Sequence, residues 1–170
     1  MKRIVLLLLV AASMGGLTLS AQTVNSLENG KYSLSVGDVT LTVDASRGGK
    51  IVSYKYKDTE ILSQTRMPNS FGSTFWTSPQ SEWNWPPVPE YDTKPFNAEV
   101  TDGKLVLTGE KSKRFGYKVR KEFVADTKDN AIVITYTLVN ESGETRKVAP
   151  WEISRVPNGG ILFFDAKEVT

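Results

Sequence analysis

Hydrophobic and polar residues alternate with a period of two through much of the chain. Residues 32–36 and 39–43 alternate on either side of Gly37-Asp38, and residues 50–56 alternate again, with a turn at 57–59 before a short segment at 60–62. This alternation is typical of β-strands with one buried face, and a Gly-Asp pair suits a tight turn. The pattern therefore predicts a hairpin followed by a third and a fourth strand.

The alternation returns after residue 97. Segments 98–100 and 104–109 flank Asp102-Gly103, segments 117–125 and 131–140 flank a second turn, and further strands are expected at 147–156 and 161–164. No segment carries the i, i+3, i+4, i+7 apolar stripe of a helix. We predict an all-β fold of about ten short antiparallel strands, an antiparallel β-sandwich. Both faces of 131–140 are apolar, which predicts a central strand covered on both sides.

The pattern lapses between residues 63 and 96. A loop of this length, roughly 30 residues, is usually functional or disordered. This segment holds Trp76, Trp83 and Trp85, and disordered segments contain few aromatic residues. We therefore expect an ordered loop with a functional role.

The side chains of this loop suit a sugar. Indole faces of Trp76, Trp83 and Trp85 can stack on the apolar C–H face of a pyranose, and Gln80 and Glu82 can hydrogen-bond its hydroxyls. Three nearby prolines stiffen the backbone. A neutral ligand rich in hydroxyls fits better than a phosphate, because no glycine-rich cradle with a lysine accompanies the rings. The alternative, that the rings pack into the core, stays open at this stage.

The N-terminus predicts export. Residues 1–21 combine a basic start, a leucine run and a small-residue end at Ala21, the pattern of a secretory signal peptide cleaved after Ala21. We expect a periplasmic or secreted protein whose single domain spans residues 22–170. No lipobox cysteine follows, so we expect no membrane anchor.

Charge and composition exclude several functions. Removing Lys2 and Arg3 with the signal peptide leaves 19 basic and 19 acidic residues, so the mature chain is formally neutral. A protein with no net charge and no basic cluster is a poor candidate for binding nucleic acid. The sequence has no histidine and no cysteine, which excludes a Ser-His-Asp triad, histidine-ligated zinc and thiolate sites within these residues. We expect no metal and no cofactor.

Three segments resemble one family. They are SRGGKIVSYKYKDTEIL (46–62), FGSTFWTSPQSEWNWPPVPEYD (71–92) and APWEISRVPNGGILFF (149–164). Together they resemble the galactose mutarotase-like (aldose 1-epimerase-like) superfamily, in particular its secreted DUF4380-type branch. The resemblance implies an antiparallel β-supersandwich with a sugar-binding cleft on one sheet, of which this chain covers the N-terminal part. A basic residue of relatives near Arg66 can reach a sugar hydroxyl.

The resemblance does not extend to the catalytic residues of mutarotases. Mutarotase chemistry uses a carboxylate and histidines; no histidine is present at 151–156, where the family has one, and the catalytic carboxylate of relatives would fall beyond residue 170. Glu152 is either a sugar-hydroxyl acceptor or weak base, or, like Arg155, an ordinary strand charge paired across the sheet. Arg155, on a largely apolar face of the same expected strand, would need a carboxylate partner.

We therefore expect a secreted carbohydrate-binding protein without histidine-based epimerase chemistry and with no catalytic residue assigned. Its partner would be a mono- or oligosaccharide, and an exposed sheet edge could pair with a second copy of the chain. Two alternatives stay open: a sugar-modifying, epimerase-like enzyme that uses carboxylates, and a non-catalytic β-sandwich interaction or structural module. The expected ligand-binding set is Arg66, Trp76, Gln80, Glu82, Trp83, Trp85 and Glu152.

Overall fold

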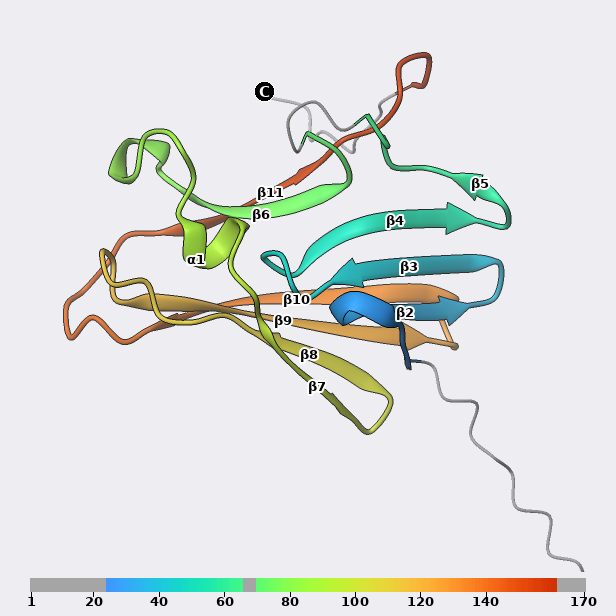
Figure 1. The fold of residues 1–170 in the computed structure, drawn as a ribbon, viewed down its shortest axis with the longest axis horizontal. Coiled ribbons are helices and arrows are strands. Elements are labelled where there is room, and N and C mark those ends of the chain that lie inside the picture. The colour runs from blue at the N-terminus through green and yellow to red at the C-terminus, as the bar shows by residue number, and fades with distance from the viewer. Residues whose placement is uncertain (1–23, 66–69, 162–170) are drawn as a thin grey trace, which may run out of the picture.

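The computed structural model describes residues 24–65 and 70–161 and confirms the predicted all-β class (Figure 1). The expected signal peptide, Arg66 and nearly all of the strand expected at 161–164 lie outside the described residues. In the described part of the chain no helix has the length and apolarity needed to cross a membrane.

Eleven strands and three short helical turns are described. The strands are β1 (Val24–Ser26), β2 (Lys31–Val36), β3 (Val39–Asp44), β4 (Lys50–Tyr56), β5 (Thr59–Glu60), β6 (Ser73–Ser78), β7 (Asn97–Thr101), β8 (Lys104–Thr108), β9 (Tyr117–Asp126), β10 (Ala131–Asn140) and β11 (Ala149–Ser154). The helical turns are η1 (Glu28–Gly30), η3 (Gln80–Glu82) and α1 (Pro89–Asp92).

The strands form two antiparallel sheets, and Figure 1 shows one sheet lying across the other. The larger sheet has the order β1-β2-β3-β4-β6-β11, with β5 beside β4, and the smaller has the order β10-β9-β8-β7. The predicted hairpins are confirmed as β2–β3, β7–β8 and β9–β10. Asp102 and Gly103 both have positive φ, 50° and 72°, as a tight hairpin turn requires.

Two strands were missed by the sequence pattern, the short β1 and β6. β6 lies inside the segment expected to be loop, and it joins β4 to β11 in the larger sheet. Its sequence, STFWTS, has strand-forming residues but no alternation, because Ser73, Thr74 and Thr77 are buried together with Phe75. Polar residues in buried positions conceal a strand from any analysis of hydrophobic periodicity.

The prediction that residues 131–140 form a central strand is wrong. Among the described residues, β10 is an edge strand that pairs only with β9. Its side chains Ile132, Ile134 and Tyr136 pack against the core, whereas Val133 on the other face is 47% exposed. Apolar residues on both faces of a strand therefore do not show that both faces are covered.

The core lies between the two sheets. Phe75 of β6 and Tyr136 of β10 stack across it with ring centroids 4.7 Å apart. Several core side chains are fully buried. They include Leu34, Val43, Leu105, Leu107, Val119 and Phe123.

Lys121 of β9 is buried within this core, with only 2% of its surface exposed. Its Nζ donates hydrogen bonds to the carbonyl oxygens of Gly48 (2.7 Å) and Gly49 (3.1 Å). Burial lowers the pKa of Lys121 to about 7; charges of Glu152 and Asp92 partly oppose this. A neutral amine has two N–H groups, which matches the two carbonyl acceptors.

Lys121 should make the stability of the fold depend on pH. Between a folded pKa of about 7 and an unfolded value of about 10.4, the unfolded chain binds a proton that the folded chain does not. The free energy of unfolding should therefore rise with pH in this window, by roughly 1 kcal/mol per pH unit, and Lys121→Met should remove this rise. Urea denaturation of both proteins between about pH 7 and pH 10 measures the difference. Parallel pH profiles for the two proteins would contradict the assignment.

Candidate functional site

The candidate site is a cavity of about 410 Å³ on the outer face of the larger sheet. This volume lies within the range of roughly 300–1,000 Å³ found for small-molecule sites. Its walls come from β6, from the residues beyond η3, from the β3–β4 turn and from the residue after β11. The lining residues are Arg47, Lys50, Ser70, Thr74, Trp76, Trp85, Pro86, Pro87, Asp92, Thr93 and Arg155.

Trp76 of β6 lines the cavity. Its neighbour Phe75 points into the core, so the alternation of β6 turns Trp76 outward. All four tryptophans of the chain meet here, because Trp76 makes edge contacts with Trp83, Trp85 and Trp151 at centroid distances of 5.9, 5.7 and 5.7 Å. Perpendicular ring pairs are favoured by the charge distribution of aromatic rings, and they fix the orientation of Trp76.

A hydrogen bond to Asp92 holds the Trp76 ring. The indole Nε1–H of Trp76 donates to Asp92 Oδ1 at 2.8 Å. Asp92 is the last residue of α1, and buried Tyr91 beside it donates its hydroxyl proton to the Tyr117 carbonyl of β9 at 2.9 Å. The helical turn is therefore anchored in the core, and the one carboxylate of the cavity has a fixed place.

The β3–β4 turn brings two cations to the cavity. Gly48 and Gly49 both have positive φ, 63° and 57°, a conformation that glycine adopts readily. A Cβ atom on Gly48 would lie 2.3 Å from the carbonyl oxygen of Asp92, so only glycine allows this close approach. The turn thereby places Arg47 and Lys50 beside Asp92 in the cavity wall.

Cations outnumber anions in the cavity. Arg47, Lys50 and Arg155 line it together with one carboxylate, Asp92. Arg155 donates to Thr74 Oγ1 at 3.1 Å and lies over the Trp76 ring, 5.9 Å from its centroid. The prediction of sequence analysis that Arg155 needs a carboxylate partner is not met among the described residues, which give it a hydroxyl acceptor and an aromatic ring instead.

The structure brings only part of the expected ligand-binding set to this cavity. Trp76 is half-buried, and Trp85 is 68% exposed; both line the cavity. Trp83 does not line it, because its ring is 4% exposed and its Nε1–H donates to the Thr77 carbonyl at 2.9 Å. Trp83 is thus a core residue beneath Trp76, and it has no open face for a ligand.

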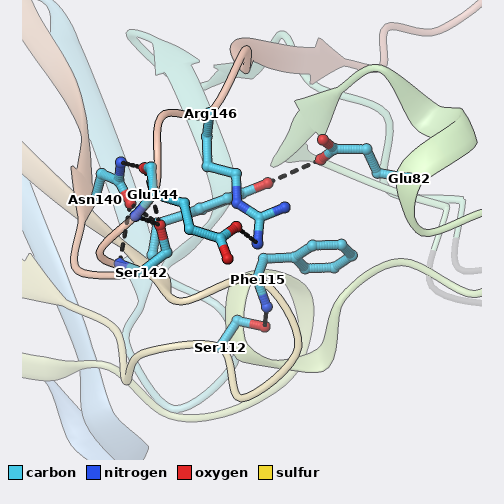
Figure 2. Close-up of polar contacts among 8 residues, drawn as sticks. Glu82, Ser112, Phe115, Asn140, Ser142, Glu144 and Arg146 are labelled. Atoms are coloured by element: carbon cyan, nitrogen blue, oxygen red, sulfur yellow. Dashed lines mark hydrogen bonds and ion pairs between the residues drawn. The ribbon is translucent and has the colours of Figure 1, made fainter.

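The polar residues of η3 point elsewhere. Gln80 is exposed and is not among the residues that line the cavity. Glu82 accepts a hydrogen bond from the Tyr117 hydroxyl at 3.0 Å, and Figure 2 shows it facing the loop that carries Arg146. Burial, together with this hydrogen bond, raises the pKa of Tyr117 to about 12. Glu82 therefore has a structural partner on β9.

Glu152 lies on the face of β11 opposite the cavity. It pairs across the sheet with Phe75, whereas its neighbour Trp151 pairs with Trp76 on the outer face. The pKa of Glu152 is raised, chiefly because neighbouring atoms exclude water from its carboxylate, although the residue is exposed overall. The hydrogen bond with Ser154 and the charges of Lys121 and Arg155 lower the pKa and partly oppose this effect. Glu152 therefore lies on the face of the larger sheet that Phe75 also occupies, on the last strand of that sheet.

Sequence reasoning missed Arg47 and Lys50 as site residues. The only signal was their position on either side of the Gly48-Gly49 pair, and nothing local indicated that this turn meets α1. Arg47 also borders a second, more open cavity of about 480 Å³ on the same outer face, lined in part by Thr42, Ser53 and Lys55.

Residues 24–65 and 70–161 contain no group of three or more His, Cys, Asp or Glu side chains placed to hold a metal ion. Comparison of the chain with protein families, with curated proteins and with solved structures gave no match. The functional argument therefore rests on the geometry of the cavity.

The burial of the indoles gives a direct test of their roles. Trp83→Ala should lower the free energy of unfolding by about 3–5 kcal/mol, because it leaves a hole in the core and an unpaired Thr77 carbonyl. Trp85→Ala should change it by no more than about 1 kcal/mol, because the ring is mostly exposed. Urea denaturation followed by circular dichroism measures both. Equal losses of unfolding free energy in the two variants would contradict the assignment of Trp83 to the core and of Trp85 to the surface.

Proposed function

We propose that the protein binds a mono- or oligosaccharide in the cavity between Trp76 and Trp85. The observation that carries the proposal is the placement of two accessible indoles at one cavity that is also lined by polar and charged side chains. Indole faces bind the apolar side of a sugar ring, and the polar walls suit its hydroxyls.

The polar groups of the cavity offer both acceptors and donors. Asp92 Oδ1 is engaged by Trp76, and Oδ2 has no hydrogen bond within the described residues, so it can accept from a hydroxyl. Thr74, Thr93 and the guanidinium of Arg155 can donate. A pyranose with several hydroxyls uses such a mixed set, whereas an apolar ligand would leave these groups unpaired.

Binding without catalysis is the function that these groups support best. Interconversion of anomers requires one group that takes a proton from the anomeric hydroxyl and another that protonates the ring oxygen. Asp92 is the one carboxylate among the lining residues, and it already accepts the Trp76 indole proton. The N-terminal sequence supports placing this binding function in the periplasm or outside the cell.

Titration of the purified protein with a panel of neutral and acidic mono- and oligosaccharides tests the proposal. Binding should be detected by calorimetry and by a change in tryptophan fluorescence. Trp85→Ala should weaken it by up to about tenfold, since an aromatic stacking contact contributes roughly 0.5–1.5 kcal/mol.

Tyr56→Ala is the matched control, because Tyr56 is also an exposed aromatic residue of the larger sheet but does not line the cavity. It should leave affinity unchanged. Failure of every saccharide to bind, or equal losses in Trp85→Ala and Tyr56→Ala, would reject the proposal. Faster equilibration of sugar anomers, followed by nuclear magnetic resonance, would instead favour an epimerase-like enzyme.

A further inference from the structure

We infer that the saccharide bound in this cavity carries a carboxylate, so that the ligand is a hexuronate or an oligosaccharide that contains one. The inference deepens the proposed function and rests on it. It differs from the expectation drawn from sequence, in which the tryptophan-rich loop considered alone favoured a neutral sugar.

The first argument is the balance of charge. The guanidinium groups of Arg47 and Arg155 contribute two positive charges to the cavity wall and Asp92 one negative charge, which leaves an excess of positive charge. A ligand that covers these groups removes water from them, and burying a cation without an anion is costly. A neutral sugar would bear that cost, whereas a carboxylate would offset it.

The second argument is how the other cations of the molecule are satisfied. The seven ion pairs within the described residues involve Lys57, Lys94, Lys104, Lys118, Arg120 and Arg146, all outside the cavity. In the same part of the chain, the guanidinium groups of Arg47 and Arg155 have no carboxylate partner, although Asp92 lines the same cavity. Two guanidinium groups are therefore available to a ligand, and their planar N–H pairs match a carboxylate.

The third argument distinguishes a carboxylate from a phosphate. Phosphate sites usually use backbone N–H groups of a glycine-rich turn. Here the Gly48 N–H donates to the Lys94 carbonyl at 2.8 Å and the Lys50 N–H to the Arg47 carbonyl at 3.1 Å, so these amides are occupied. Asp92 would also repel a doubly charged phosphate more strongly than a singly charged carboxylate.

The experiment compares D-galacturonate with D-galactose and with the methyl ester of galacturonate, which keeps the shape and removes the charge. Calorimetric titration at low salt should give at least about tenfold tighter binding for galacturonate than for either neutral sugar. D-Glucuronate and glucose should show the same order if the cavity accepts their hydroxyl configuration. Added salt should weaken the binding of the acid and leave that of the neutral sugars unchanged.

Arg155→Gln should reduce galacturonate affinity about tenfold and galactose affinity much less, because glutamine keeps a hydrogen-bond donor and removes the charge. Arg146→Gln is the matched control, because Arg146 pairs with Glu144 outside the cavity. If Arg155→Gln does not fold, as judged by circular dichroism, Arg47→Gln replaces it, since the Arg47 side chain makes no hydrogen bond within the described residues.

The outcomes separate the two proposals. Neutral sugars that bind as tightly as their acids would overturn the carboxylate inference and leave the saccharide proposal in place. Tighter binding of galactose 6-phosphate than of galacturonate would overturn the choice of carboxylate. Absence of binding by any sugar, neutral or acidic, would reject the proposed function and this inference together.

Discussion

Two hydrogen bonds from one buried lysine connect the fold to the site. Lys121 reaches from β9 to the carbonyls of Gly48 and Gly49, so the smaller sheet fixes the turn that joins β3 to β4 in the larger sheet. A buried lysine is costly to a small protein unless its N–H groups are satisfied, and here both acceptors belong to one tight turn. The same turn meets the carbonyl of Asp92 so closely that a Cβ atom is excluded. The packing of the two sheets and the shape of the cavity are therefore set by a single constraint.

The four tryptophans show how a core and a binding surface can share one aromatic cluster. Trp83 is buried and hydrogen-bonded, and it supports Trp76 from below, while Trp85 remains open to solvent. A ligand-binding indole must be oriented before the ligand arrives, because ordering a side chain on binding reduces affinity. The contact with Trp83 and the hydrogen bond to Asp92 provide that orientation for Trp76. Under the proposed function, the structural interpretation applies to Trp83 and the ligand-binding interpretation to Trp76 and Trp85.

The sequence predicted most strands and little of the site, for one physical reason. Alternation of apolar and polar residues reports local burial, and it located β2 to β4 and β7 to β9. β10, which is largely apolar on both faces, was located by its length and its β-branched residues. The sequence pattern missed β6, whose buried serine and threonine side chains break the alternation, and it overestimated the cover of β10, whose outer face is apolar but exposed. The cavity joins segments that are far apart in the chain, such as Arg47 and Arg155, and no local pattern reports such proximity.

Net charge is an equally incomplete guide to a ligand. The formal charge of residues 22–170 is zero, which argued against nucleic acid as a partner. A net charge of zero does not show where the charges lie. Many cations outside the cavity lie next to carboxylates, as Lys104 and Arg120 do with Glu122. Paired charges contribute little to the field at a distance, whereas the guanidinium groups of Arg47 and Arg155, which form no ion pair among the described residues, add positive charge at the cavity. A neutral chain can therefore present a strongly cationic site, and the chemistry of its ligand follows from which charges are unpaired.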